Sequence, residues 1–549
     1  MAERKIILIL SGEICSGKTT LAINLLNKYH FNVLKTKEGI SHYIKSDKKH
    51  KETELSREFL QNYGETLDKK TNGKWLLKYF QEIYGVDFSI KNYFLVDSAR
   101  ILKQIEHFRS AYSYLVYHIH LIAKPDSLTE RYHRRNENKI LGIDVSKKIY
   151  SIIKSNETEK KVIDLAKDAD LVIDTDRCST EDVLIRVASF LKLLPNIDNQ
   201  SVDVLIGGQF GSEGKGQVAA HIAPEYDCLI RVGGPNAGHS VYELPNNHIF
   251  HLIPSGSFRN QTAKLLIGAG AVLSLEKIVE EISNFSLEDS NRLVIDENAT
   301  IIKQKDIKYE QKIKEHIGST GQGVGSATAN NILARLMGND KHKAKHYQKE
   351  LGHYLGSVTG ELEKCYSLNS KILLEGTQGT ALSLYHGIYP HVTSRDTTVS
   401  GCLSEAGISP KRVRKIIMVI RTYPIRVGGT SGKFISNEIT WKEIATRSGK
   451  KLKDLINNEK TSTTKRDRRV AEFSWELFRK ACEINSPTDI ALTFTDYISN
   501  DNEKARRYDQ LTAETRQLIE EIERCSGIKV SLIGTCFDYR AIIDRRNWR

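Results

Sequence analysis

The sequence predicts an α/β protein in two parts, an N-terminal parallel-sheet domain with a glycine loop fused to a compact second α/β domain. Short apolar runs typical of buried parallel strands recur along the 549 residues. One such run opens each half and enters a glycine-rich loop, at residues 12–19 and 207–216. The polar, turn-rich stretch 195–200 separates the halves, so we expect domains at 1–197 and 201–549.

Composition places the chain among globular proteins. Apolar residues make up 40% and charged residues 27%, and no apolar run approaches the roughly 18 residues of a membrane span. The start lacks the apolar stretch of a signal peptide, so we expect a cytoplasmic protein that does not enter a membrane. The net charge of +13 is spread evenly, which suits small anionic substrates better than nucleic acid, although a merely soluble basic surface explains it equally well. The eight cysteines form no C-x-x-C pair and are expected to be reduced thiols.

The first glycine loop has the spacing of a phosphate-binding loop. It follows the apolar run 5–11 and precedes the helical pattern 21–29. Glycines there let backbone N–H groups surround phosphates, Lys18 adds a positive charge, and Thr19 can ligate magnesium. The residues predicted to form this loop are Gly12, Ser16, Gly17, Lys18, Thr19 and Thr20.

Charged residues later in the first half fit phosphoryl transfer. Asp97 ends a second buried-type strand, 93–97, and can reach the magnesium shell. Arg131, Arg134 and Arg135 lie on a helix-like stretch after a third strand, 114–122, and can close over a transferring phosphate. An ordinary strand-end Asp and a solvated basic helix are the alternatives. A last strand, 170–174, and a helix to about residue 194 complete this half.

With these motifs the first half resembles the nucleoside monophosphate kinases, particularly the phage-type deoxynucleotide kinases. The resemblance rests on the loop 12–19, the segments 56–64 and 96–100, and the lid-like stretch 131–135. It implies a P-loop kinase-like parallel-sheet domain in which Arg57 holds the acceptor monophosphate.

The second half opens with a strand, 202–206, and five glycines in the ten residues 207–216. They allow tight turns and close backbone approach to phosphates, with Lys215 as counter-charge, although the spacing is not that of a P-loop and a structural turn is the alternative. Asn236, Gly238 and His239 follow on a tight loop, where His239 is either an acid near neutral pH or a structural histidine.

Further polar loops follow in the second half. Segments 318–325 and 375–380 combine glycines with hydroxyl and amide side chains, which suits phosphate and base recognition. In segment 463–469, Arg466 and Arg468 alternate, so on an extended loop both point the same way and suit a dicarboxylate; a solvated charge run is the alternative.

Together these blocks closely resemble the adenylosuccinate synthetase family over almost all of residues 201–549. The blocks occur in the family's order, at 208–216, 234–239, 251–256, 319–321, 375–379, 389–394 and 463–469. That family joins aspartate to a 6-oxopurine nucleotide: a nucleoside triphosphate phosphorylates O6, and the aspartate amine then displaces phosphate. The resemblance implies a compact α/β ligase domain that uses Mg²⁺ and ATP or GTP, binds a purine nucleoside monophosphate and L-aspartate, and forms a homodimer.

The resemblance also implies roles for individual residues. The catalytic set would be His239, Ser212, Lys215 and Gln378. The donor nucleotide would contact Gly211, Glu213, Gly214, Gly216, Ser240 and Asp496, with the Gly238 carbonyl on magnesium. The purine nucleotide would contact Asn236, Thr320, Gly321, Arg335 and Thr393. Aspartate would be held by Thr463, Thr464, Arg466 and Arg468.

The main departure from the family is Ser212, which stands where the family has the aspartate that takes the N1 proton and ligates magnesium. A serine hydroxyl is too weak an acid for its oxyanion to replace that carboxylate at neutral pH, so either the chemistry is lost or the substrate differs. A branch of the family with serine here acts on dGMP and makes 2-aminoadenylosuccinate deoxynucleotide, and this chain is similar to that branch. The acceptor of the N1 proton is left open, with Glu213 adjacent.

Three further departures concern the donor and the assembly. In this family a lysine and an aspartate together recognise the guanine of GTP. Here Phe494 stands in place of the lysine while Asp496 is retained, which favours ATP or dATP as the donor. Gln322 stands where many members carry arginine, and Arg335 is the candidate for reaching a neighbouring subunit's nucleotide. The short interval from 325 to 375 suggests the compact form of archaea and phages.

Three functions follow from the sequence. The first is a dGMP–aspartate ligase fused to a kinase, the second a conventional IMP-using synthetase, and the third a catalytically silent nucleotide sensor.

Overall fold

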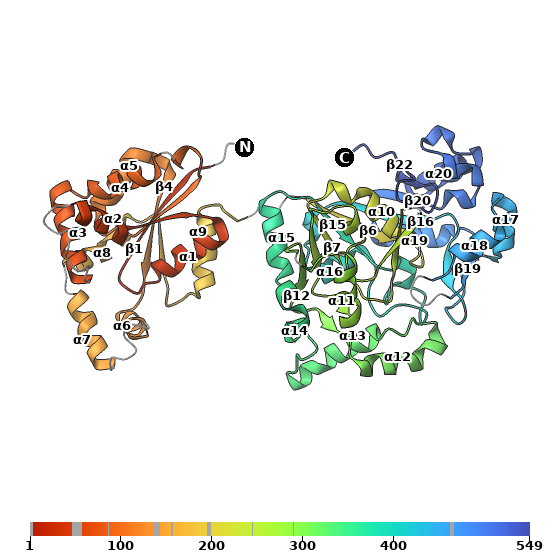
Figure 1. Cartoon of the computed structure of the whole chain (residues 1–549), viewed down its shortest axis with the longest axis horizontal. Coiled ribbons are helices and arrows are strands. Elements are labelled where there is room, and N and C mark those ends of the chain that lie inside the picture. Colours follow the sequence, from red (N-terminus) through yellow and green to blue (C-terminus); the bar gives the residue numbers. More distant parts are fainter. Residues whose placement is uncertain are drawn as a thin grey trace. The chain divides into compact units, whose positions relative to one another are not determined.

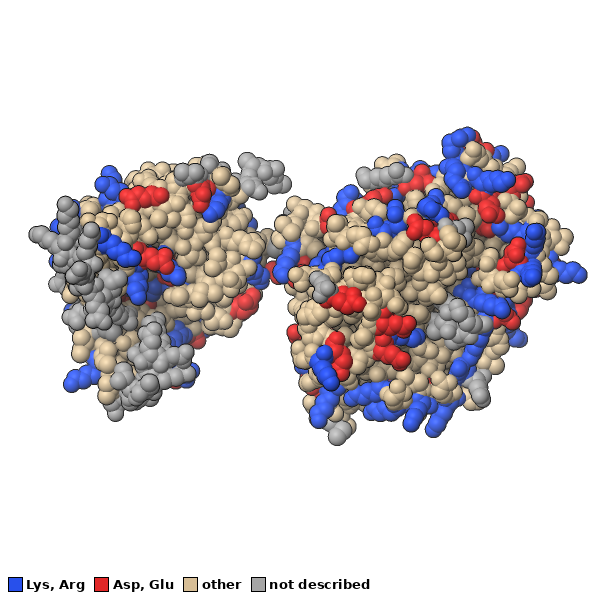
Figure 2. Space-filling model, in the orientation of Figure 1, with Lys and Arg blue, Asp and Glu red and all other residues tan. Residues whose placement is uncertain are grey.

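A computed structural model describes residues 4–46, 57–85, 87–134, 143–154, 157–194, 199–243, 245–288, 290–461 and 466–548. Its contacts divide the chain into two compact units, Met1–Leu194 and Pro195–Arg549 (Figure 1). Basic and acidic side chains are interspersed over the visible surface of both units (Figure 2). No helix in the described ranges is long and apolar enough to cross a membrane.

The first unit is a five-stranded parallel sheet in the order β2-β3-β1-β4-β5, flanked by helices. Its strands are β1 Ile6–Gly12, β2 Asn32–Lys35, β3 Tyr93–Asp97, β4 Val116–Ile122 and β5 Leu171–Asp174. Its helices are α1 Lys18–Tyr29, α2 Thr36–Ser46, α3 Arg57–Thr71, α4 Lys74–Tyr84, α5 Leu102–Tyr112, α6 Pro125–His133, α7 Ile143–Lys154, α8 Glu157–Asp164 and α9 Thr180–Phe190.

The central strand β1 explains why the sheet has a helical layer on each face. All of its residues are buried, and alternate side chains point to opposite faces of the sheet. Leu8 joins a cluster that includes Leu25 of α1 and Val187 of α9. Ile9 joins a second cluster that includes Phe80 of α4 and Phe108 of α5. A strand buried on both faces requires the unbroken apolar run seen in the sequence.

The second unit is built on a ten-stranded sheet in the order β14-β12-β10-β7-β15-β6-β16-β20-β21-β22. All neighbouring pairs are parallel except β21–β22. The strands are β6 Val202–Gly207, β7 Cys228–Arg231, β10 Lys264–Ile267, β12 Leu293–Asp296, β14 Leu355–Gly356, β15 Ile372–Glu375, β16 Val413–Arg421, β20 Asp489–Thr493, β21 Val530–Gly534 and β22 Ile542–Asp544.

Three small sheets and a set of helices surround this large sheet. The small sheets pair β8 His239–Glu243 with β9 Asn246–Phe250, β11 Val272–Leu273 with β13 Thr300–Ile301, and β19 Arg468–Ala471 with both β17 Ile425–Val427 and β18 Glu438–Ile439. The helices are α10 Lys215–Ile222, α11 Leu275–Asn284, α12 Gln304–Ile317, α13 Val324–Leu333, α14 Gln348–Leu351, α15 Val358–Ser367, α16 Val399–Ala406, α17 Trp441–Ser448, α18 Leu452–Asn458, α19 Trp475–Asn485 and α20 Ala513–Ser526.

The topology of the second sheet marks where a ligand would bind. The chain leaves β6 toward β7 on one side and later places β16 on the other side of β6, so the winding direction reverses there. In open α/β sheets, ligands bind in the crevice beyond the carboxyl ends of the strands at such a reversal. The predicted α/β class, with mainly parallel sheets, is confirmed.

Candidate functional site

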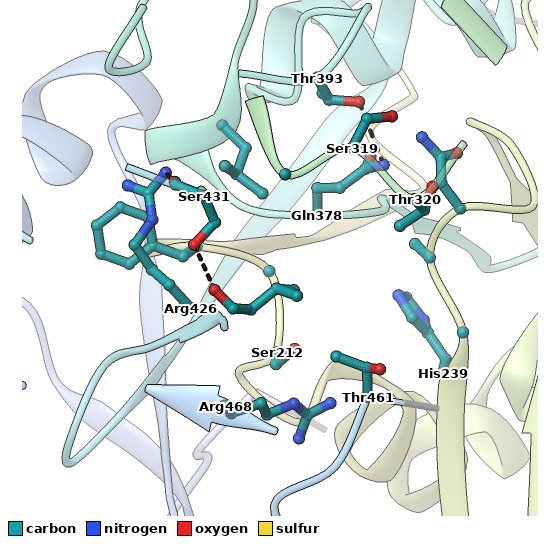
Figure 3. Close-up of a pocket in the computed structure, with 18 of the residues that line it drawn as sticks. Ser212, His239, Ser319, Thr320, Gln378, Thr393, Arg426, Ser431, Thr461 and Arg468 are labelled. Atoms are coloured by element: carbon teal, nitrogen blue, oxygen red, sulfur yellow. Dashed lines mark hydrogen bonds between the residues drawn. The ribbon is translucent and has the colours of Figure 1, made fainter. Parts of the chain in front are cut away.

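A pocket of about 700 Å³ opens at the carboxyl ends of β6, β7 and β20 in the second unit. Loops far apart in the sequence meet around it (Figure 3). The predicted site residues that line it are Gly211, Ser212, Gly214, Lys215, Gly216, Asn236, Gly238, His239, Ser240, Thr320, Gln378, Thr393 and Arg468. The sequence blocks therefore converge on one cavity.

The glycine loop after β6 is held by one buried glutamate. Glu213 is 1% exposed; its Oε1 accepts backbone N–H groups of Gln209 at 3.0 Å and Gly211 at 2.7 Å. Its Oε2 lies 2.7 Å from Nζ of Lys215, which also donates to the Gly211 carbonyl. Gly211 itself has φ of 109°, a conformation that glycine adopts readily. Glu213 thus fixes the loop, and both of its oxygens are occupied.

His239 presents one ring nitrogen to the pocket and has the other fixed. Its Nδ1 lies 2.5 Å from Oε1 of Glu375, at the end of β15. Nε2 is buried without a hydrogen-bond partner among the described residues. Burial, and then the positive charge of Arg231, lower the pKa of His239 to about 4. The imidazole is therefore neutral at pH 7, with Nδ1–H donating to the carboxylate and Nε2 free to meet a ligand.

Glu375 remains an anion despite its burial. Burial alone would raise its pKa, but Arg231 and the hydrogen bonds from His239 and Ser255 outweigh it and lower the pKa to about 2. The Ser255 hydroxyl donates to Oε1, and the Ser255 backbone N–H donates to Oε2 at 2.7 Å. A fully hydrogen-bonded buried carboxylate is a rigid orienting group for the histidine it contacts.

Carboxylates are scarce around Ser212. Among the described residues that line the pocket, the one carboxylate is Glu310 of α12. Its two oxygens accept backbone N–H groups of Gly323 and Gly325, the latter at 2.7 Å. No described carboxylate with a free oxygen therefore lines the cavity beside Ser212.

Arg468 is positioned by a buried cluster that the sequence motifs did not reveal. Glu459 is 1% exposed; its Oε2 lies 3.0 Å from Arg468 Nη1 and its Oε1 lies 2.6 Å from Arg421 Nη2. Burial opposes ionisation, but the two arginines and the Tyr497 hydroxyl lower the pKa of Glu459 to about 2. Arg421 also donates to the backbone carbonyl of Ser212 at 3.1 Å, so one carboxylate ties the arginine loop to the glycine loop.

The pocket lining includes polar atoms that have no hydrogen-bond partner among the described residues. Asn236 Oδ1 and both amide atoms of Gln217 are buried without hydrogen bonds to described residues, and both side chains line the pocket. Gln378 Nε2 donates to Thr393 Oγ1 at 3.5 Å (Figure 3). Arg426, stacked 4.5 Å from the Phe210 ring, adds a buried cation. No motif spacing in the sequence pointed to Gln217 or Arg426.

Several predicted residues do not line the pocket. Gly321 and Arg466 lie outside its lining, as does Glu213. Arg335 is exposed on the surface after α13 and donates to the Ile332 carbonyl. Asp496 is 1% exposed and pairs with Lys450 Nζ at 2.9 Å; burial raises its pKa to about 6 although Lys450 lowers it. Thr463 and Thr464 fall outside the described residues.

A second pocket of about 820 Å³ lies in the first unit, above the loop after β1. The predicted residues that line it are Ser16, Gly17, Lys18, Thr19, Thr20, Asp97 and Arg131. Lys18 Nζ donates to the carbonyls of Gly12 and Glu13, each at 2.7 Å. Burial, and then Arg100, lower the pKa of Lys18 to about 7. A phosphate in this pocket would restore the charged form of Lys18.

The other predicted residues of this unit are placed as follows. Thr19 Oγ1 lies 3.5 Å from Asp97 Oδ2, and burial raises the pKa of Asp97. Arg131 contacts Thr175 and pairs with Asp176 at 2.9 Å, so it lines the pocket from a fixed position. Gly12 ends β1 and Arg134 pairs with Glu130, and both lie outside the lining. Neither Arg135 nor the side chain of Arg57 is described.

The two pockets offer oxygen donors rather than a preformed metal cage. Across the described ranges, no group of three or more His, Cys, Asp or Glu could hold a metal ion. Mg²⁺ keeps several waters and takes few protein ligands beside substrate phosphates, which the Thr19–Asp97 pair fits.

A parallel sheet with a braced glycine loop and a carboxylate-held histidine at its carboxyl edge defines a nucleotide-binding α/β enzyme. Comparison with known proteins identifies the family. The adenylosuccinate synthetase family profile matches residues 204–337 and 336–503. Adenylosuccinate synthetase of Methanocaldococcus jannaschii is 37% identical over 354 residues, which cover 63% of this chain and 96% of that protein. The chain therefore belongs to the adenylosuccinate synthetase family, and its second unit is an adenylosuccinate-synthetase-like ligase.

Two solved structures share the fold of the second unit. The fully ligated adenylosuccinate synthetase of Plasmodium falciparum aligns with a TM-score of 0.55 at 22% identity and covers 63% of this chain and all of that one. The cyanophage S-2L succinoaminodeoxyadenylate synthetase, bound to dGMP and dATP, aligns with a TM-score of 0.52 at 22% identity, covering 64% of this chain and 96% of that one.

Proposed function

We propose that this protein has two activities: the second unit joins L-aspartate to C6 of dGMP at the expense of ATP or dATP, and the first unit phosphorylates a nucleoside monophosphate. The observation that carries the ligase assignment is the neutral His239, fixed by Glu375 through Nδ1 and open to the pocket through Nε2, beside a residue 212 that is serine.

The ligase reaction would proceed in two steps. First, the purine releases its N1 proton to solvent and a bond forms between O6 and the γ-phosphorus of the donor, while the bond to the β-phosphate breaks and the nucleoside diphosphate leaves. The negative charges of bound phosphates raise the pKa of the nearby His239, so that Nε2–H can donate to the transferring oxygens, with Lys215 as a second cation. In the second step the aspartate amine attacks C6, and the O6-phosphate leaves as inorganic phosphate.

The choice of dGMP rests on position 212. A carboxylate there would stand beside the purine, whereas serine is smaller and uncharged and leaves room for a 2-amino group. No described carboxylate with a free oxygen lines the cavity, so the N1 proton of IMP and that of dGMP alike lack a carboxylate base there, and the choice between the two rests on the space at residue 212. The cyanophage S-2L enzyme with dGMP and dATP supplies an analogy of fold.

The proposal that ATP or dATP is the phosphoryl donor rests on the surroundings of Asp496. Its partner is Lys450, which comes from a different segment, and neither side chain lines the pocket. Phe494 and Phe537 line the pocket instead, with ring centroids 4.9 Å apart. Aromatic rings stack on any base and do not read the donor and acceptor pattern of guanine.

The substrate L-aspartate would be bound by Arg468, together with Arg466, Thr463 and Thr464. Arg468 lines the pocket, and Glu459 fixes its guanidinium, so less conformational freedom is lost when a carboxylate binds.

Magnesium fits both sites. The Gly238 carbonyl, which lines the ligase pocket, and the Thr19–Asp97 pair of the first unit offer hard oxygen donors. When bound, Mg²⁺ would neutralise charge on the phosphates of the donor.

The kinase proposal rests on the loop after β1. Lys18 is buried in the pocket, where it would contact the donor phosphates, and Arg131 would neutralise charge on the transferring group. Arg57, Arg134 and Arg135 are further candidates for the acceptor and lid.

A homodimer through the second unit is part of the proposal. Leu336 is 94% exposed and Leu333 69% exposed on the same surface as Arg335. Exposed apolar side chains around an arginine suit an interface through which Arg335 reaches the partner's purine nucleotide.

The decisive experiment incubates the protein with ATP, L-aspartate and either dGMP or IMP, and measures aspartate-dependent phosphate release and the succinyl product. We expect turnover with dGMP. Turnover of IMP alone would assign the conventional synthetase activity instead. Tight dGMP binding with no phosphate release from any donor would assign the sensor, which the missing carboxylate at residue 212 also favours.

A further inference from the structure

The pocket of the first unit extends from the phosphate-binding loop to a polar recess against α3. Five described residues of α3 line it at helical spacing, Leu60, Gln61, Gly64, Glu65 and Asp68, so one face of the helix borders the cavity. Ile40 of α2 lies opposite Gly64, where a side-chain Cβ would come within 3.0 Å of the Ile40 Cδ1. The absence of a side chain at Gly64 lets Ile40 pack closely against α3 at the edge of the recess.

Asp68 is anchored through one oxygen only. Its Oδ1 accepts from Trp75 Nε1 at 2.6 Å and from Gln104 Nε2 at 2.9 Å. No hydrogen bond from the described residues reaches its Oδ2. Burial raises the pKa of Asp68, and Glu65 contributes to that rise although both hydrogen bonds oppose it. An N–H group of a ligand at Oδ2 would stabilise the charged carboxylate.

Gln61 lies on the same face of α3, one turn before Glu65 and two turns before Asp68, and it offers a hydrogen-bond donor where they offer acceptors. Its Nε2 is buried and donates to none of the described residues. The recess therefore combines two carboxylates, which accept hydrogen bonds when ionised, with one amide N–H₂ group, which donates them.

The other end of the pocket is cationic. Lys18, Arg100 and Arg131 line it. Arg100 is held by an ion pair of 2.5 Å to Glu159, which lies in the same lining. A nucleotide would accordingly place its phosphates at this end and its base against α3.

The hydrogen-bonding pattern selects among bases. Adenine, hypoxanthine, cytosine and thymine each carry one donor group on the pairing edge. Guanine and 2-aminoadenine each carry two donor groups and one acceptor, because both have a 2-amino group. Two carboxylates and one amide N–H₂ match two donors and one acceptor.

We propose that the first unit phosphorylates a 2-aminopurine nucleoside monophosphate. In the bound state the exocyclic 2-amino group would donate a hydrogen bond to Asp68, and the Gln61 amide N–H₂ group would donate one to an acceptor atom of the base. The inference rests on the proposed kinase activity and names its substrate class. It means that both units handle purines that carry a 2-amino group, either the dGMP used by the ligase or the 2-aminoadenine nucleotide that a later elimination of the succinyl carbons would yield.

The test uses the full chain with ATP and magnesium, without aspartate, and measures nucleoside diphosphate formation by chromatography. The acceptors are dGMP, dIMP, dAMP and 2-amino-dAMP. We expect kcat/KM for dGMP or 2-amino-dAMP to exceed that for dIMP and dAMP by at least about tenfold, and the two 2-amino substrates identify which purine is used. Equal rates for dGMP and dIMP, with 2-amino-dAMP no better than dAMP, would overturn the proposal.

Asp68→Asn retains an oxygen for Trp75 while it removes the negative charge, and it should lower the preference for each 2-amino substrate over its counterpart at least about fivefold. Asp164→Asn is the matched control, because Asp164 is exposed and pairs with Lys167 outside the pocket. An unchanged preference in folded Asp68→Asn would exclude Asp68 as a reader. If that variant does not fold, the comparison of substrates on the unaltered chain decides alone. Absence of any diphosphate, with every acceptor, would instead refute the kinase activity itself.

Discussion

At position 212 the protein has a side chain that holds no negative charge at neutral pH, and its surroundings do not replace that charge. Glu213, the sequence neighbour that could have served as the base, has both oxygens occupied by Gln209, Gly211 and Lys215 and is engaged in holding the loop. Glu310 is engaged by backbone N–H groups in the same way. Under the proposed function, substrate choice would therefore depend on what residue 212 allows beside the purine.

Ser212→Asp should shift preference from dGMP toward IMP. The carboxylate restores a base and a magnesium ligand but crowds a 2-amino group, and its hydrogen bonds to guanine would hold the ground state more tightly than the transition state. The ratio of kcat/KM for IMP to that for dGMP should rise by at least about tenfold. Ser212→Ala is the control, since it adds neither charge nor bulk and should leave the ratio little changed. Faster dGMP turnover in Ser212→Asp, with IMP unused, would contradict the steric account.

Acidification should destabilise the second unit through His239. Its pKa is about 4 in the folded protein and about 6.5 in an unfolded chain, so below pH 6.5 the unfolded chain binds a proton that the folded chain does not. The free energy of unfolding therefore falls as pH drops from about 6.5 to about 4. The lowered pKa of Glu375, about 2, acts in the same direction at still lower pH.

The measurement is the Tm at pH 7 and pH 5 for the unaltered protein and for His239→Asn, which keeps an amide donor for Glu375. The variant should lose part of the pH dependence. His120 of the first unit also has its pKa lowered to about 4 by burial, so only the difference between the two proteins reports on His239. Identical pH dependence in both would mean that His239 is not a neutral, buried group in the folded protein.

Sequence patterns located residues that line the pocket but not the residues that position those side chains. His239, Asn236 and Arg468 stand in local motifs, and they line one pocket. Glu375 contacts His239 across 136 positions, and Lys450 meets Asp496 from another loop. Such partners are set by strand order in the sheet, which local spacing does not encode. For Glu375 the sequence offered one signal, its position at the end of a buried apolar run and at the start of a glycine-rich block.

At the level of elements, the site is a set of strand ends connected by buried ions. β6, β15, β16 and β20 each end at the pocket or at a residue that braces it. Glu459 links Arg421, at the end of β16, to Arg468, at the start of β19. The small sheet of β17, β18 and β19 is thereby tied to the large sheet through charge. Removing one partner of such a buried network leaves an uncompensated charge.

Arg468→Leu should raise the KM for aspartate far more than the KM for the purine nucleotide. One charge-assisted hydrogen bond contributes about 1.5–3 kcal/mol, which corresponds to roughly ten- to hundredfold in KM. Initial-rate kinetics with each substrate varied in turn measure the two constants. Arg479→Leu is the control, because Arg479 is exposed and pairs with Glu483 on α19. An unchanged aspartate KM in a folded Arg468→Leu variant would remove this arginine from the aspartate site.

At the level of the whole molecule, the described residues form one pocket on each of two separate sheets, and we propose that each pocket binds a nucleotide. The α/β class of both sheets was predictable because parallel strands buried on both faces leave a strong apolar signature. The small β8–β9 and β17–β19–β18 sheets were not, since their strands are only two to five residues long and resemble loops in sequence. Each pocket has its own lysine, Lys18 in one and Lys215 in the other, on the first turn of the helix that follows a glycine loop.

Because the two sheets have separate cores, the two activities should be separable by single substitutions. His239→Ala should abolish aspartate-dependent phosphate release and leave nucleoside diphosphate formation intact, since His239 contacts Glu375 and Ser255 of its own unit. Lys18→Ala should have the opposite effect, because Lys18 donates to the loop that begins at Gly12. Both activities are measured on the same preparation, with the Tm of each variant as the check on folding. Loss of both activities in either folded variant would show that the pockets depend on each other, and the two-unit account of this enzyme would then be wrong.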